Sequence, residues 1–299
     1  MADPLTRRVA ARLEPKVRRE FLAAIKQLES EIDIAALVTA VQSRSQDAVD
    51  LALKLSTLPK RFDKMVDTIV TGFQRAGVLT AQELTAAGLS YTFDLTNPFA
   101  VSWARNYGGT LISEVAAGAR GSARILNVVR VAVGDGIEFG VPPVQTARLL
   151  RESVGLTPRM AKAVDNRFKQ VVEKRWAVHG NIDRAMAEAG KSALAYKKKL
   201  INHRARLIAR TETINASNAG QMQSWQQAAD KNLLSRKRTR RKWVTGLDDL
   251  VCNICAPMHG QTVAFEGESF ITGLGASVDM PTAHPACRCG MDLVFEGKG

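Results

Sequence analysis

The sequence lacks long apolar runs and has few cysteines. No stretch approaches the ~18–20 uninterrupted apolar residues of a membrane-spanning helix, so we expect no membrane span. The first 20 residues carry positive charges without the apolar core of a secretory signal, and we expect no export. All four cysteines lie between positions 252 and 289. In the reducing cytosol that this implies, clustered thiols indicate metal ligands or redox groups rather than disulfides.

Acidic residues are scarce in one long segment. Residues 191–243 hold 14 Lys or Arg against only Glu212 and Asp230, so nearly all of the net charge of +13 lies there. A local surplus of this size attracts polyanions, of which nucleic acid is the usual one. A solvated helix face followed by a basic loop is the alternative. The densest run, 235–242, supplies the candidate nucleic-acid contacts Arg236, Lys237, Arg238, Arg240, Arg241 and Lys242.

Apolar spacing predicts helices through most of the chain. Positions 17, 21, 25 and 28 fall three and four residues apart, and positions 62, 65, 66, 69 and 73 repeat the pattern after Pro59. Another helix is expected after Pro158, with Thr157 as its N-terminal cap. The body of the protein is therefore expected to be helical.

A further long helix is expected over residues 201–231. One of its faces is apolar except for Thr211 and Asn218, and it consists of Leu207, Thr211, Ile214, Asn218, Met222 and Trp225. Polar groups on a buried face need partners, so we expect these two to hydrogen-bond a neighbouring segment. A catalytic role for Glu212 or Asn218 lacks a matching base, nucleophile or phosphate loop nearby.

The character of the sequence changes after Lys231. Short β-type runs, "RKWVTG", "QTVAF" and "MDLVF", alternate with Gly, Asp and Pro. The expected fold is mainly α: a long helical body of about 230 residues, then a small, loop-rich α+β module with cysteines, histidine and short strands. We divide the sequence into 1–150 and 151–299, with the Cys/His subdomain at 241–299.

Four cysteines and a histidine form a candidate metal site. Cys252 and Cys255 are spaced as C-x2-C, which lets one tight turn aim both thiolates at one ion. "HPACRC" adds His284, Cys287 and Cys289. Two tetrahedral sets are open: the four cysteines, or the first three with His284. His259 is a further candidate, and a structural zinc ion would stabilise a module with little core.

Other readings of the cluster stay open at this point. Reduced cysteines packed in a small core are one, and a disulfide formed only after release from the cell is another. A catalytic zinc ion would need an open coordination position and a general base. The neighbouring acids, Asp248, Asp249, Glu266 and Glu268, form no H-E-x-x-H or H-x-E…C-x-x-C arrangement.

Taken together, these segments resemble the phage head morphogenesis family, the Mu F-like minor head proteins. The resemblance covers roughly residues 155–295 and runs in the family's order: an A-R-T-E helix, a K-W strand, a C-x2-C segment and a terminal H-P-x-C-R-C. The matching positions are Arg210, Thr211, Glu212, Asn218, Gly220, Lys242, Trp243, Asp248 or Asp249, Cys252, Cys255, Gly260, His284, Pro285, Cys287, Arg288 and Cys289. Residues 1–150 carry no motif that we can place.

The resemblance implies a virion protein of a tailed bacteriophage that is not an enzyme. Such proteins are expected near the portal on the capsid interior, with the host cytoplasm as the place of assembly. Their roles are head assembly, DNA packaging or DNA delivery, and their expected partners are the portal protein, the major capsid or scaffold protein and packaged double-stranded DNA. Residues 1–150 are the candidate for portal or capsid contact. A zinc-dependent nuclease and a free zinc-ribbon DNA-binding regulator are the alternatives.

Overall fold

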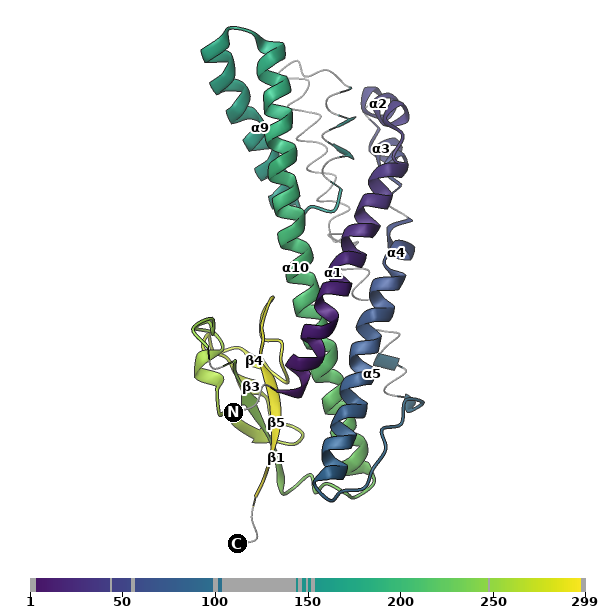
Figure 1. The fold of residues 1–299 in the computed structure, drawn as a ribbon, viewed down its shortest axis with the longest axis vertical. Helices are drawn as coiled ribbons and strands as arrows, with labels where there is room; N and C mark the ends of the chain where they lie inside the picture. The colour runs from purple at the N-terminus through teal and green to yellow at the C-terminus, as the bar shows by residue number, and fades with distance from the viewer. Residues whose placement is uncertain are drawn as a thin grey trace. The chain divides into compact units, whose positions relative to one another are not determined.

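A long helical body precedes a small strand-containing module, as the sequence predicts (Figure 1). The computed structural model describes residues 4–43, 45–54, 57–98, 102–103, 144, 147–148, 150–151, 154–246 and 248–296. The helices are α1 (Leu5–Glu31), α2 (Ile34–Gln42), α3 (Gln46–Ala52), α4 (Leu58–Arg61), α5 (Asp63–Ala86), α9 (Pro158–His179) and α10 (Ile182–Asp230). None of these helices has an apolar stretch able to cross a bilayer.

The chain forms two compact units, each built from separate segments. Unit 1 contains residues 1–19, 64–107 and 206–299, and unit 2 contains residues 20–63 and 108–205. Helices α1 and α10 therefore supply residues to both units. The division at residue 150, which rests on sequence alone, stays a prediction.

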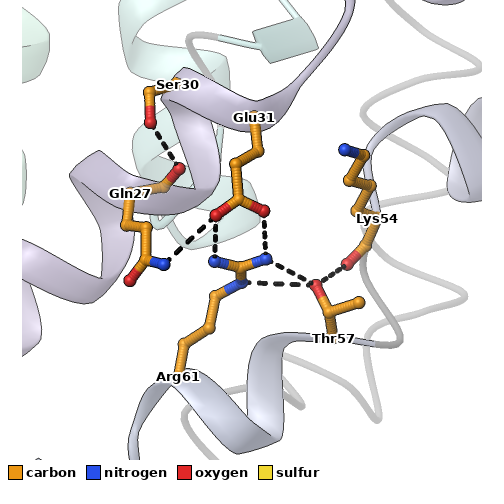
Figure 2. A network of polar contacts seen from close by, with 6 residues as sticks. All are labelled: Gln27, Ser30, Glu31, Lys54, Thr57 and Arg61. Carbon is orange, nitrogen blue, oxygen red and sulfur yellow. Dashed lines mark hydrogen bonds and ion pairs between the residues drawn. The ribbon is translucent and has the colours of Figure 1, made fainter.

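Unit 2 is held by aromatic packing and a polar network. Phe21 of α1 stacks on Phe62, with ring centroids 5.7 Å apart. Glu31, in the last turn of α1, accepts two hydrogen bonds from the guanidinium of Arg61 (Figure 2). The same guanidinium donates to Thr57 Oγ1, whose hydroxyl donates to the Lys54 carbonyl at 2.7 Å. The network ties the end of α1 to α4 and lowers the pKa of Glu31 through its bonds from Arg61.

Unit 1 contains a helical core formed by the start of α1, α5 and the second half of α10. Leu5, Val9 and Ala76 are buried together. Helices α5 and α10 approach so closely that a Cβ at Gly220 would lie 2.0 Å from the Phe73 carbonyl oxygen. Glycine at position 220 is thus required by the helix contact.

The C-terminal module adds two small antiparallel sheets to unit 1. The strands are β1 (Thr239–Val244), β2 (Thr262–Ala264), β3 (Phe270–Ile271), β4 (Ser277–Val278) and β5 (Gly290–Phe295). Central β1 pairs with β2 and β5, and β3 pairs with β4. Trp243 is fully buried and meets the Phe270 ring edge-on at 5.1 Å. A few large side chains therefore make up the apolar core of this module.

The helical and strand predictions from periodicity are confirmed. The spaced apolar residues at positions 17, 21, 25, 28, 62, 65, 69 and 73 are buried, and Val66 is half-buried. Thr157 caps α9 by accepting a hydrogen bond from the Met160 N–H at 3.3 Å. The expected strand runs become β1, β2 and β5. Helix α10 begins 19 residues before the predicted start at residue 201, because the turn at Gly180 and Asn181 already ends α9.

Candidate functional site

The first half of the Cys/His cluster is a tight turn. The N–H groups of Cys255 and Ala256 donate to the Cys252 carbonyl at 3.1 and 2.9 Å, which brings the two thiols of the C-x2-C pair to one side. Burial alone would raise the pKa of the Cys252 thiol. Hydrogen bonds from the backbone N–H groups of Cys255 and Ile254 outweigh that effect and lower the pKa. Backbone donors aimed at sulfur favour the thiolate, which is the form that binds metals.

The second half of the cluster is the "HPACRC" segment. His284 Nε2 lies 3.1 Å from the Cys252 Sγ and 3.2 Å from the Cys255 Sγ, and the Cys255 and Cys287 sulfurs are 3.8 Å apart. His284 Nδ1 lies 2.8 Å from the Pro285 carbonyl oxygen. A carbonyl only accepts hydrogen bonds, so Nδ1 carries the proton and Nε2 offers its lone pair.

These side chains form two overlapping groups that lie close enough to hold a metal ion. One is Cys252, Cys255 and His284; the other is Cys255, Cys287 and Cys289. In each group the ligand atoms lie within 4.8 Å of one another. Ligands at ~2.3 Å from a tetrahedral ion put sulfurs roughly 3.8 Å apart, which matches the Cys255–Cys287 separation. All four cysteines are free thiols, so the metal-ligand interpretation fits the geometry.

His259, which the sequence offered as a further candidate metal ligand, forms a hydrogen bond to Thr245 instead. Its Nδ1 accepts a hydrogen bond from the Thr245 backbone N–H at 3.2 Å. It belongs to neither of the two groups. His259 therefore joins the loop after β1 to the turn that follows the C-x2-C pair.

The cluster is attached to α10 by two of the motif residues. Thr211 Oγ1 accepts a hydrogen bond from the Ala286 N–H at 2.8 Å, and Asn218 Nδ2 donates to the Cys289 carbonyl at 3.3 Å. These bonds confirm that the polar residues on the buried face of α10 bind a neighbouring segment. Ala286 has a positive φ of 63°, which directs its N–H at Thr211. The A-R-T-E helix and the terminal "HPACRC" segment are thus parts of one site.

Arg288 of the "HPACRC" segment takes part in an ion-pair network. Asp248 accepts two hydrogen bonds of 2.6 Å from the Arg288 guanidinium, and Arg7 of α1 adds a contact of 3.5 Å. The bonds from Arg288 lower the pKa of Asp248. Nearby, Arg210 pairs with Glu14 of α1 at 3.2 Å. Nothing in the sequence indicated that Arg7 and Glu14 belong to this region, because each forms its ion pair with a residue about 200 or more positions away.

Several arginine side chains of the basic run 235–242 bind carboxylates or carbonyls of the chain itself. Arg236 pairs with Asp230 and Glu266, and Arg240 pairs with Glu268 and Glu296.

Arg241 is buried, and its guanidinium lies 5.5 Å from the centre of the Phe270 ring. It donates to the backbone carbonyls of Ala264, Glu268 and Asp279. The predicted nucleic-acid contacts in the run that remain exposed are Lys237 and Arg238, while Lys242 is partly buried.

Glu212 lies beside Thr211 on α10. Among the residues that the structure describes it has no hydrogen-bond or ion-pair partner. Burial raises the pKa of its carboxyl from 4.5 to about 7. Since the folded pKa is the higher one, the neutral carboxyl stabilises the fold at low pH. That stability decreases as pH rises from about 4.5 through 7. We expect Glu212→Gln to flatten this part of the profile and to raise the free energy of unfolding at pH 8 by up to ~3 kcal/mol. Urea denaturation at pH 5 and pH 8 measures the difference; equal pH dependence in both proteins would contradict it.

The protein is thus a mainly helical protein with a small Cys/His module, whose candidate metal site is hydrogen-bonded to the long helix α10. The family model described as "Phage Mu protein F like protein" matches residues 127–291, and the chain belongs to this family. No curated protein and no solved structure matches the chain. Membership indicates a phage head morphogenesis protein and a place in the virion, and it implies capsid-assembly partners.

Proposed function

We propose that the protein is a minor head protein of a tailed bacteriophage, positioned near the portal on the capsid interior. It would act in head assembly and in DNA packaging or delivery, with portal, major capsid or scaffold protein and packaged DNA as its partners. The family match over residues 127–291 carries this proposal. The residues that resemble the family motif support it, because Thr211 and Asn218 bind the segment of His284 to Cys289 as one folded unit.

The proposed role is structural rather than enzymatic. Three of the acidic residues that neighbour the cysteines in the sequence are held in ion pairs: Asp248 with Arg288, Glu266 with Arg236 and Glu268 with Arg240. The hydrogen bonds from Arg288 lower the pKa of Asp248, which makes this carboxylate a poor general base. The Cys/His cluster therefore fits a structural metal ion better than a catalytic one.

We also propose that the metal is zinc. Thiolates with one imidazole are the donor set typical of structural zinc. Cys252, Cys255 and His284 form one group of ligand atoms, and Cys287, whose sulfur lies 3.8 Å from that of Cys255, would be the fourth ligand. When bound, the ion would link the C-x2-C turn to the "HPACRC" segment. Since that segment is also bound to Thr211 and Asn218, the ion would hold the module on α10.

Mass spectrometry of purified particles tests the proposed function. We expect the protein in mature heads at low copy number, and we expect a tagged copy to co-purify with the portal protein from infected cells. A major capsid peptide set in the same digest is the control for detection. Absence from both mature heads and portal-containing assembly intermediates would contradict the proposal.

A further inference from the structure

The hairpin formed by α9 and the first part of α10, in unit 2, carries a surplus of positive charge. The two helices run antiparallel and are joined at Gly180, which adopts a positive φ of 63° (Figure 1). Residues 158–205 contain 12 Lys or Arg against four Asp or Glu. This surplus of eight lies outside the 235–242 run.

Two of the four acidic residues of the hairpin pair with its cations, while Glu173 and Asp183 are exposed. Glu188 of α10 binds both Arg175 of α9, at 2.9 Å, and Arg184, at 3.2 Å. Asp165 binds Lys169 at 3.0 Å. A second group of cations is exposed and has no ion-pair partner among the described residues: Arg159, Lys162, Lys174, Lys191, Lys198 and Lys199. These side chains are available to an anion from outside the chain.

Helix geometry puts part of this group on one line. Lys191 and Lys198 are seven residues apart, which is almost two helical turns, so their side chains leave α10 in nearly the same direction about 10.5 Å apart. Arg184 lies seven residues earlier on the same line, but Glu188 already binds it. Lys199 follows beside Lys198. The spacing of Lys191 and Lys198 corresponds to roughly three base pairs of duplex DNA. It lets both lysines contact phosphates along one backbone.

Helix α9 lies alongside this line. Arg167 Nε donates to Ser192 Oγ of α10 at 3.1 Å, next to Lys191 in sequence. Trp176, the most exposed aromatic side chain of the hairpin, leaves α9 nearly opposite to Lys174, which is two residues away, and within about 40° of Lys162, which is fourteen residues away. With Trp176 as the one exposed aromatic ring among its described residues, the hairpin offers little on which successive bases could stack, so it fits a duplex backbone better than single-stranded nucleic acid.

We propose that this hairpin surface, defined by Lys162, Lys174, Lys191, Lys198 and Lys199, binds the phosphate backbone of double-stranded DNA without sequence preference. The proposal rests on the proposed function in that it names the surface that would meet packaged DNA. It moves the main contact away from the 235–242 run, where carboxylates already neutralise Arg236 and Arg240.

Fluorescence anisotropy of a labelled 40-base-pair duplex, between 50 and 200 mM salt, tests the proposal. The triple variant Lys191→Gln, Lys198→Gln, Lys199→Gln is expected to reduce the magnitude of the salt slope by about 2–3 and to weaken binding at least tenfold at 50 mM salt, since each phosphate contact contributes ~0.9 to the slope. The double variant Lys162→Gln, Lys174→Gln should reduce the slope by about 2. It gives an independent readout on α9 if the triple variant misfolds.

Two variants of equal charge serve as controls. Lys26→Gln, Lys60→Gln, Lys64→Gln removes three exposed lysines from α1, α4 and α5. Arg236→Gln, Lys237→Gln, Arg238→Gln does the same in the basic run. Both should keep a slope close to that of the unaltered protein.

Three outcomes would overturn the proposal: no binding of the duplex by the unaltered protein, a control variant that loses as much slope as the hairpin variants, or tighter binding of a single strand of the same length. Each can occur while the protein is still found in virions, so failure here is separate from failure of the proposed function.

Discussion

Chelation is expected to lower the melting temperature of the protein by about 10 °C or more, because a structural ion contributes its binding free energy to folding. The Cys/His module has a small apolar core, and the ion would join two segments that are about 30 residues apart. Metal analysis of the purified protein should give about one zinc per chain. A metal-free protein whose melting temperature is unchanged by a chelator would contradict the proposed site.

Single substitutions identify which side chains bind the ion. Cys255 belongs to both groups of potential ligands, so Cys255→Ser is expected to lose the zinc and the associated stability. If the set is Cys252, Cys255, Cys287 and His284, then His284→Ala should lose most of the metal and Cys289→Ser should retain it. His259→Ala is the matched control, since His259 bonds to Thr245 instead. Retention of full metal content by Cys255→Ser would exclude both groups.

Gly220→Ala is expected to destabilise unit 1 by about 3 kcal/mol or more, near the upper end for overpacked contacts. The added methyl group would meet the carbonyl oxygen and carbon of Phe73 at 2.0 and 2.8 Å. These are backbone atoms of α5, so a rotamer change cannot relieve the overlap and the two helices must separate. The midpoint of urea unfolding, with native-state hydrogen exchange of α5 amides, measures the loss.

Gly190→Ala is the matched control on the same helix. A Cβ at that position has no atom within 4 Å, so the substitution only improves helix propensity and should stabilise by ~0.5–1 kcal/mol. Opposite signs for the two variants are the expected result. If Gly220→Ala were as mild as Gly190→Ala, the close contact of α5 and α10 would be wrong.

Sequence periodicity predicted the fold class because the signals are local. The buried positions of α1 and α5, the Thr157 cap and the three main strands follow from residues within a few positions of one another. The division into two compact units could not be predicted from sequence periodicity. It depends on which parts of α1 and α10 pack with which other segments, and no spacing within a single helix encodes that choice.

The site was predictable to a similar degree. The candidate ligands follow from cysteine spacing, and the need for partners of Thr211 and Asn218 follows from their place on an apolar face. Arg241 shows the limit of the same reasoning. In a run of basic residues it reads as a surface charge, yet β1 turns its side chain inward, where backbone carbonyls and the Phe270 ring take up the guanidinium. Strand alternation distinguishes inward from outward cations only after the register is known.

Residues 4–7 lie against residues 246–248 and 290 in unit 1, and this has a consequence for the synthesis of the protein. Arg7 contacts the Gly246 carbonyl and Asp248, and a side chain at Gly290 would collide with Pro4 and Thr6. At roughly 5–20 residues per second, the ribosome makes the first of these partners tens of seconds after α1 emerges. Unit 1 therefore completes its fold only after residues 246–290 have been made, and a chain terminated before them would lack the module that Arg7 contacts.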